Sequence, residues 1–186
     1  MALPQRKPAA YQDLLDLPEN WVGEIIDGEL YAQPRPAPRH ARSSSSLGDE
    51  LVSPFDKGRG GPGGWWILDE PELHLGPHIL VPDLAGWRRE RLPKLPDTAW
   101  FELAPDWVCE VLSPGTAAKD RAKKMPRYAA EGVGHCWLVD PDARTLEVYQ
   151  NTEGGWLLLG VFEGDDGISA APFDAICFSL GVLWAE

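Results

Sequence analysis

Hydrophobic and polar positions along the chain alternate with two different periods. Alternating runs on either side of Asp27-Gly28 predict a β-hairpin over residues 24–31, because Asp-Gly favours the tight turn that joins two strands. Short apolar runs bounded by turn residues predict further strands. These runs are 65–69, 72–75, 84–87, 107–112, 135–139, 145–149 and 156–161.

Helical spacing of apolar residues appears in three segments, 11–17, 40–55 and 117–131. Pro126 lies inside the third segment and removes a backbone hydrogen bond, so we expect a kink or a break there. Gly132 is expected to end that helix. The order strand, helix, strand from about residue 107 to residue 139 predicts a right-handed crossover between parallel strands.

Length and composition are those of one ordinary globular domain. The chain has 186 residues, of which 44% are hydrophobic and 25% charged. The predicted class is α/β, a central mixed sheet flanked by helices with antiparallel hairpin additions. We expect a single domain over 1–186, with a core at 20–150 and C-terminal strands at 155–185 packed on it. No apolar run reaches the length of a bilayer and the N-terminus lacks a secretion signal, so we expect a cytoplasmic protein without membrane contact.

Several kinds of site are disfavoured. The three cysteines are each flanked by apolar residues and share no metal-ligand spacing, which indicates buried thiols. They are Cys109, Cys136 and Cys177. His74 and His78 are close in sequence, but Pro77 between them argues against a helix that would bring both to one zinc ion. The glycine-rich loop at 58–64 lacks the Lys-Ser/Thr ending of a nucleotide-binding loop, so ATP or GTP binding is not expected.

The charge distribution bears on nucleic-acid binding. A formal net charge of −12 counts against the basic footprint that DNA-binding proteins normally show. Sixteen of the seventeen Lys and Arg residues lie before Tyr128, however, and nine of these fall between Arg88 and Arg127. The basic residues therefore gather around the candidate chemistry described next.

Two carboxylates stand in apolar surroundings. A carboxylate inside an apolar strand is costly unless it is paired or binds a metal. Alternation places Val108, Glu110 and Leu112 on one face, which favours a functional Glu110 over an edge residue that faces solvent. Asp83 follows Pro82 and is either a turn aspartate or a second functional carboxylate.

Two carboxylates followed by a lysine match the needs of a magnesium-dependent phosphodiesterase. Magnesium is held by one or two carboxylates plus water and substrate phosphate, which suits Asp83 and Glu110. We expect both at the C-terminal edge of adjacent strands, close enough to share one divalent ion. Lys124 suits the third role, positioning water or neutralising the phosphate, because its helix can return over the end of the Glu110 strand. Any single lysine there could instead belong to a solvated helix face.

The sequence also resembles a known family. The segments that carry the resemblance are 26–30, 81–84, 110–114, Asp120 with Lys124 and Tyr128, and 132–141. In consistent order from residue 11 to 185, they resemble the bacterial Uma-two family of putative restriction endonucleases, within the PD-(D/E)XK nuclease superfamily. The resemblance implies a restriction-endonuclease-like fold and a divalent-metal site with Asp83 and Glu110 as ligands. It also implies that Glu24 is the acidic residue that some members contribute from an early element.

The lysine departs from the superfamily pattern. The resemblance implies a lysine two places after Glu110, where this chain has Leu112. Lys124, in the following helix, is the residue that the resemblance implies as the catalytic lysine. Lys119 and Lys123 remain alternatives.

Two functional hypotheses follow. The first is a DNA endonuclease that uses Mg²⁺ or Mn²⁺ and forms a homodimer or higher homo-oligomer, so that both strands can be cut. The second is a catalytically weak or inactive nuclease-fold protein that acts as a binding or oligomerisation module. The acidic charge and the nine tryptophans, some of which we expect to be exposed as a partner surface, favour the second.

Overall fold

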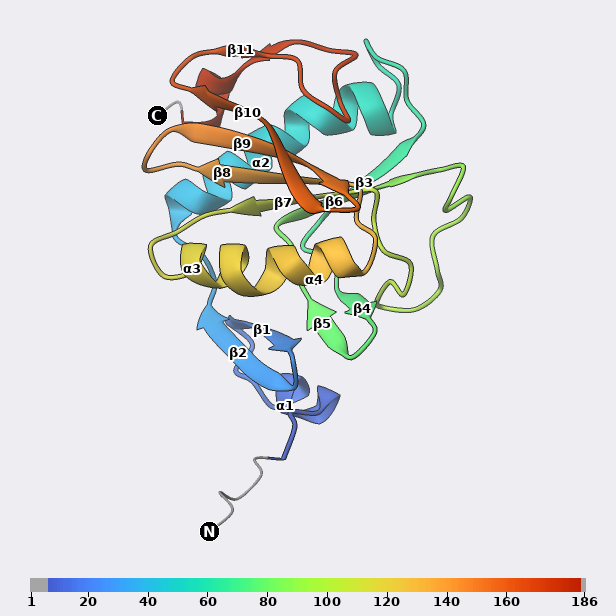
Figure 1. Cartoon of the computed structure of the whole chain (residues 1–186), viewed down its shortest axis with the longest axis vertical. Coiled ribbons are helices and arrows are strands. Elements are labelled where there is room, and N and C mark those ends of the chain that lie inside the picture. The colour runs from blue at the N-terminus through green and yellow to red at the C-terminus, as the bar shows by residue number, and fades with distance from the viewer. Residues whose placement is uncertain (1–6, 185–186) are drawn as a thin grey trace.

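The structure, a computed structural model, describes residues 7–184 and is built on a six-stranded mixed sheet (Figure 1). The strand order is β10-β9-β8-β7-β6-β3, and β7 and β8 are parallel whereas the other neighbours are antiparallel. The strands are β3 (Trp65–Asp69), β6 (Leu84–Arg88), β7 (Trp107–Val111), β8 (His135–Asp140), β9 (Thr145–Thr152) and β10 (Gly155–Glu163). Each coincides with a predicted strand, and the α/β class with a mixed sheet is confirmed.

The crossover from β7 to β8 is an interrupted helix. It consists of α3 (Ala117–Lys119), a π-helical turn η2 (Asp120–Lys124) and α4 (Met125–Ala130). The predicted irregularity is therefore present, and it takes the form of a π-helical turn directly before the turn that contains Pro126. Both Asp120 and Lys124, which belong to this π-helical turn, are buried.

Strand β7 divides the core into two layers, because successive side chains of a strand point to opposite faces. Trp107 and Val111 pack on the face that α2 covers, together with Leu47. Val108 packs on the opposite face with Tyr128 of α4. The helical elements outside the crossover are α1 (Tyr11–Leu15), α2 (Pro38–Leu51), the π-helical η1 (Val52–Asp56) and the 3-10 helix η3 (Leu180–Leu183). Within residues 7–184, no helix combines the length and the apolar character that crossing a bilayer requires.

A second, four-stranded sheet lies below the large one in Figure 1. Its order is β2-β1-β5-β4, and all its neighbours are antiparallel. The strands are β1 (Trp21–Ile26), β2 (Glu29–Pro34), β4 (Leu73–Leu75) and β5 (His78–Leu80). Asp27 and Gly28 turn the predicted hairpin with φ angles of 54° and 76°. Two positive φ angles define the tight turn that Asp-Gly favours, so this prediction is confirmed.

The C-terminal segment returns to the core through an aromatic cluster. Two short strands form a further antiparallel pair, β11 (Gly167–Ile168) and β12 (Phe178–Ser179). Between them, the ring of Phe173 lies 4.6 Å from that of Phe55 and 4.9 Å from those of Trp65 and Trp107. Its distance to the ring of Trp137 is 5.6 Å. Phe173 therefore joins the end of the chain to η1 and to three strands of the large sheet.

The tryptophans do not form the exposed aromatic surface expected from their number. Among the nine, only Trp21 is exposed, with 38% of its surface accessible. The others fit the interior because several indole N–H groups donate to backbone carbonyls, as Trp87 does to Leu103 and Trp137 to Ala171, each at 2.9 Å. The tryptophans therefore do not support a partner surface.

The three cysteines are free thiols. Cys109 and Cys136 are buried, as expected, but Cys177 is exposed. Cys177 precedes β12, whose Phe178 is buried, so alternation along this extended segment turns the thiol outward.

Phe173→Ala should lower the free energy of unfolding by about 3–5 kcal/mol, because it removes the ring on which four buried aromatic side chains pack. Urea unfolding followed by tryptophan fluorescence measures the change. Leu15→Ala, at a leucine that is 61% exposed, is the control and should change stability by about 0.5 kcal/mol or less. Equal, small effects of both substitutions would show that the C-terminal segment does not stabilise the core.

Candidate functional site

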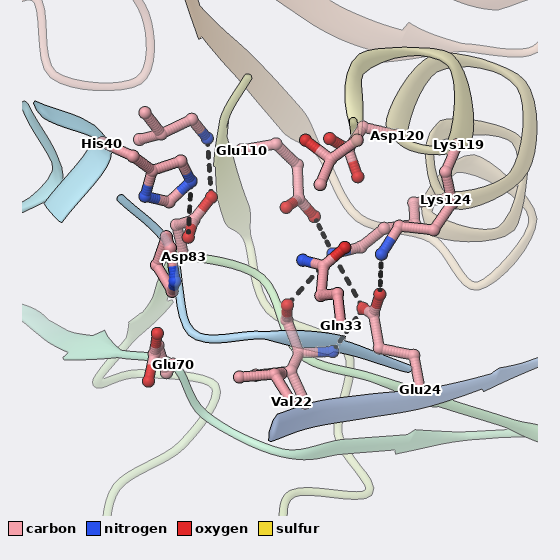
Figure 2. A pocket seen from close by; sticks show the side chains of 14 residues that line it. Val22, Glu24, Gln33, His40, Glu70, Asp83, Glu110, Lys119, Asp120 and Lys124 are labelled. Atoms are coloured by element: carbon pink, nitrogen blue, oxygen red, sulfur yellow. Dashed lines mark hydrogen bonds and ion pairs between the residues drawn. The ribbon is translucent and has the colours of Figure 1, made fainter. Parts of the chain in front are cut away.

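A small cavity lies where the two sheets meet the crossover helix (Figure 2). Its volume is about 30 Å³. The ionisable side chains that line it include Glu24, His40, Asp83, Glu110, Lys119, Asp120 and Lys124. The cavity therefore brings together both predicted metal ligands, the predicted lysine and the early acidic residue.

Asp83 and Glu110 reach the cavity from neighbouring strands that run in opposite directions. Glu110 stands one residue before the end of β7, whereas Asp83 stands directly before the start of β6. The pairing of Leu84 with Cys109 sets these positions beside each other. The expectation that both lie at C-terminal strand edges is wrong for Asp83, because β6 and β7 are antiparallel and the start of one strand adjoins the end of the other.

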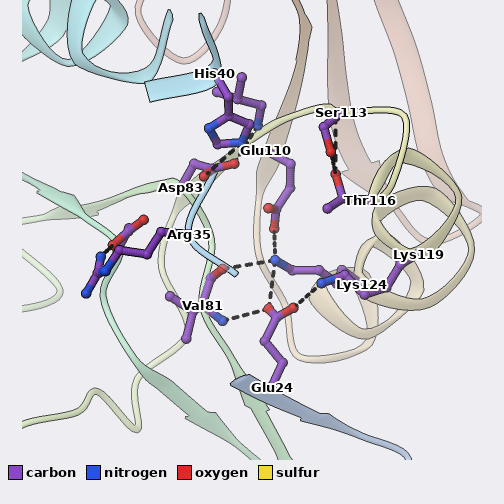
Figure 3. Close-up of polar contacts among 12 residues, drawn as sticks. Glu24, Arg35, His40, Val81, Asp83, Glu110, Ser113, Thr116, Lys119 and Lys124 are labelled. Atoms are coloured by element: carbon purple, nitrogen blue, oxygen red, sulfur yellow. Dashed lines mark hydrogen bonds and ion pairs between the residues drawn. The ribbon is translucent and has the colours of Figure 1, made fainter. Parts of the chain in front are cut away.

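Lys124 is the centre of the polar contacts (Figure 3). Its Nζ lies 2.7 Å from Oε1 of Glu24, 2.8 Å from Oε1 of Glu110 and 3.0 Å from the carbonyl oxygen of Val81. These three acceptors use all three ammonium protons. Only 2% of the residue is exposed, and burial by itself lowers the pKa of Lys124. The charges of Glu110 and Glu24 outweigh burial and raise this pKa above its usual value, which favours the cationic form of Lys124.

Glu24 holds this lysine in place from the small sheet. Its second oxygen, Oε2, lies 2.6 Å from Nζ of Lys119, and the backbone N–H of Val81 donates to Oε1 at 2.9 Å. Burial disfavours the ionised form of Glu24, but the charges of Lys124 and Lys119 outweigh it and lower the pKa of the carboxyl. Glu24 is therefore a buried anion with two cationic partners.

Glu110 is less well compensated than Glu24. Only 2% of it is exposed, and its Oε1 accepts a 2.6 Å hydrogen bond from the hydroxyl of Tyr128. Burial raises the pKa of Glu110 well above its usual value, and the charges of Asp120 and Asp83 add to this effect, although Lys124 opposes it. An additional cation near Glu110 would favour its ionised form.

Asp83 is held by the backbone and by a histidine. The N–H of Val111 donates to Oδ2 of Asp83 at 2.7 Å, and Nε2 of His40 lies 3.4 Å from Oδ1. Burial lowers the pKa of His40, but the hydrogen bond to Asp83 and its charge outweigh burial and raise the pKa. Asp83 therefore has a fixed orientation and is not a solvated turn residue.

The three candidate lysines have different environments. Lys124 contacts both Glu24 and Glu110, whereas Lys119 contacts Glu24 and has 14% of its side chain exposed. Lys123 is exposed and does not line the cavity. The alternative that the whole segment is a solvated helix face is wrong for Lys124, because the π-helical turn directs it into the interior.

Sequence reasoning did not assign a role to His40, Asp120 or Tyr128. Asp120, Lys124 and Tyr128 follow one another at intervals of four residues, which places them on one helical face. All three are buried, so this spacing was an available signal. No comparable signal marks His40, because it comes from α2 and meets Asp83 only in the folded chain.

The chemistry of the cavity fits a small divalent cation. Five carboxyl groups and two lysines line the cavity, so acidic side chains outnumber lysines; the five are Glu24, Glu70, Asp83, Glu110 and Asp120. Within residues 7–184, no set of three or more His, Cys, Asp or Glu side chains is arranged as a metal centre by itself. Magnesium needs only one or two carboxylates when water and phosphate complete its shell. The cavity is larger than the roughly 10–15 Å³ that one water molecule requires, so the residues present fit such an ion.

Known proteins resemble this chain in sequence and in fold. The profile of the Uma2 family, described as "Putative restriction endonuclease", matches residues 8–180. A solved structure with the same overall fold is that of a putative nuclease belonging to DUF820 from Anabaena variabilis, which is 26% identical. The TM-score is 0.76, and the match covers 95% of this chain and 98% of the other. No curated protein matches the chain at a significant level.

Glu24→Gln should lower the free energy of unfolding near neutral pH by about 3 kcal/mol, the cost of breaking a buried ion pair. Because the folded-state pKa of Glu24 is lowered from 4.5, its contribution is complete above that pH and is lost as the pH falls through the folded-state value. The difference in stability between parent and variant should therefore shrink below about pH 4.5. Urea unfolding at a series of pH values measures it.

Glu153→Gln is the matched control, because Glu153 is exposed in the turn between β9 and β10. It should leave stability unchanged within about 0.5 kcal/mol at every pH. A deficit of Glu24→Gln that stayed constant down to low pH would contradict the charge linkage and would indicate a purely steric role.

Proposed function

Because the chain belongs to the Uma2 family of putative restriction endonucleases, we propose that it is a metal-dependent endonuclease that hydrolyses phosphodiester bonds in DNA by the PD-(D/E)XK mechanism. The observation that carries this proposal is the position of the Lys124 ammonium, between two buried glutamates in the cavity that Asp83 also lines. A fixed cation beside a pair of carboxylates is the arrangement that phosphodiester hydrolysis requires. The cytoplasmic location inferred from the sequence is part of this proposal.

The roles of the residues follow from their contacts. Mg²⁺ or Mn²⁺ held by Asp83 and Glu110 would activate water and stabilise charge on the leaving oxygen. His40 and the backbone N–H of Val111 orient Asp83, and the Tyr128 hydroxyl orients Glu110. These contacts hold the two carboxylates in place before substrate arrives, which reduces the reorganisation needed for reaction.

Lys124 supplies the positive charge for the phosphate in the transition state. Its ammonium group donates to Glu24 and to the Val81 carbonyl as well as to Glu110, so the cation is positioned rather than mobile. Glu24 is therefore a positioning residue for the lysine. A preorganised charge of this kind contributes about two or more orders of magnitude to the rate.

The parent protein should nick and linearise supercoiled DNA in Mg²⁺ or Mn²⁺ but not in chelator. Asp83→Asn and Glu110→Gln should each lower the single-turnover rate at least about a hundredfold, because each removes an anionic ligand. Asn at position 83 still offers an oxygen to the N–H of Val111, so loss of activity would not reflect loss of that hydrogen bond. Gel electrophoresis of the cleavage products measures the rates.

Lysine variants complete this series. Lys124→Ala should lower the rate about a hundredfold or more, whereas Lys123→Ala, at an exposed lysine, should cut like the parent. If Lys119→Ala were inactive and Lys124→Ala active, Lys119 would be the residue that supplies positive charge to the phosphate. The nuclease proposal would be refuted if the well-folded parent cleaved none of supercoiled, linear and single-stranded DNA, whether Mg²⁺ or Mn²⁺ was supplied.

A second candidate function is an oligomerisation module, and one observation favours it. Strand β10 forms an edge of the large sheet, and four of its apolar side chains are 45–56% exposed. They are Leu157, Leu158, Leu159 and Val161. No charged residue occurs from Gly155 to Phe162, although the chain carries a net charge of −12. Two copies would repel each other least along this strand, and antiparallel pairing of identical edges gives a symmetric dimer. We therefore propose a homodimer joined through β10, which is compatible with cutting both DNA strands.

Light scattering should give a mass of about twice the 20.5 kDa of the chain. Leu158→Lys should convert the dimer to a monomer, because it places a charge in the uncharged edge. Leu15→Lys is the matched control, since Leu15 is 61% exposed on α1, far along the chain from β10. A parent that is monomeric at concentrations of about 100 μM, or a control that dissociates equally, would contradict pairing through β10.

A further inference from the structure

Three arginines surround a second, larger cavity of about 450 Å³. Arg39 and Arg42 come from the first turns of α2, and Arg144 comes from the turn between β8 and β9. All three are exposed. Among residues 7–184, Asp142 is the only acidic residue that lines this cavity, and it lies 3.3 Å from Nη1 of Arg39. The cavity therefore has an excess of positive charge in a chain that is strongly acidic.

Two of these arginines have no acidic partner in the part of the chain that the structure describes. Among residues 7–184, neither Arg42 nor Arg144 makes an ion pair; the guanidinium of Arg42 donates only to the hydroxyl of Ser46. The turn that carries Arg144 is held in shape, because Oδ1 of Asp140 accepts the backbone N–H groups of Asp142 and Ala143 at 3.0 and 2.9 Å. The guanidinium groups are thus available on a defined backbone.

This cavity and the candidate active site lie at the same edge of the large sheet. Strands β7 and β8 are parallel, so the turn after Asp140 adjoins the end of β7 that carries Glu110. In α2, His40 lines the active-site cavity and stands between Arg39 and Arg42 in sequence. Figure 1 shows the start of α2, the turn after β8 and the loop after β7 together at the left edge.

The active-site cavity cannot by itself attract a polyanion, because carboxylates outnumber lysines there. A DNA strand that reaches it therefore needs positive charge nearby. Arginine binds phosphate through two parallel N–H···O bonds, and its planar fork suits a phosphodiester better than a lysine does. The arginine cavity provides such groups beside the site.

We propose that Arg42 and Arg144 bind the phosphate backbone of duplex DNA, at phosphodiester groups that flank the one in the active site. This inference rests on the proposed function, because it assigns these arginines to the same substrate. It adds a separate binding determinant, which contributes to affinity and not to the chemical step. The contacts are to the backbone, so they carry no base preference.

Fluorescence anisotropy with a labelled DNA duplex and Ca²⁺ tests this binding without depending on cleavage. Arg42→Ala and Arg144→Ala should each weaken binding several-fold and lower the slope of log K against log salt by about 0.9, the value for one phosphate contact. The variant with both substitutions should lower this salt-dependence slope by about twice as much. Arg59→Ala is the matched control, because Arg59 is exposed and lies past the other end of α2 and η1, on the order of 20 Å along the helix at 1.5 Å per residue.

The hydrolysis of bis(p-nitrophenyl) phosphate separates this inference from the nuclease itself, because this small diester is too short to span both cavities. If it is hydrolysed, the arginine variants should process it like the parent. Arginine variants that bind the duplex as tightly as the parent, or an Arg59→Ala control that loses as much affinity, would overturn the phosphate site even if the parent cuts DNA. A parent that binds no duplex also overturns it. Arginine-dependent binding without cleavage in Mg²⁺ or Mn²⁺ would support the phosphate site and refute only the nuclease.

Discussion

One buried ammonium group links three parts of the fold that are distant in sequence. Glu24 belongs to the small sheet, Glu110 to the large sheet and Lys124 to the crossover between β7 and β8. Each is only 2–3% exposed, so withdrawal of any one would leave an uncompensated charge in the interior, at a cost of about 3–5 kcal/mol. The relative placement of the two sheets and the helix therefore depends on these ion pairs, and the same pairs define the candidate site.

Much of this arrangement follows from local sequence patterns. The alternation of apolar residues around Glu110 predicts a strand that buries the carboxylate, and Pro126 predicts an interrupted helix; both features are present. Strand direction is not encoded locally, which is why Asp83 was expected at the wrong end of its strand. The choice of Lys124 over its neighbours depends on the phase of the π-helical turn, and the contact of His40 with Asp83 depends on tertiary packing. Neither could be read from spacing alone.

The formal net charge of −12 does not describe how the charged residues are distributed. Carboxyl groups are concentrated where a divalent cation would bind, and burial and neighbouring carboxylates raise the pKa of Glu110 there. Such a site is strained without a cation, and functional sites commonly reduce stability in this way. The arginines lie outside this cluster but at the same edge of the sheet, so under these proposals different residues would attract the phosphate backbone and bind the cation. An acidic protein could in this way present a basic surface to DNA.

The central claim is that the carboxylates around Lys124 form a cation site, and diffraction at the manganese absorption edge tests it most directly. In crystals grown with Mn²⁺, we expect one anomalous peak bonded to carboxylate oxygens of Asp83 and Glu110, at the short distances of about 2.1–2.2 Å typical of small divalent ions. Lys124 should remain paired with Glu24. The claim would be contradicted by well-ordered crystals at saturating Mn²⁺ in which no peak occupies this cavity and Lys124 still bridges Glu24 and Glu110.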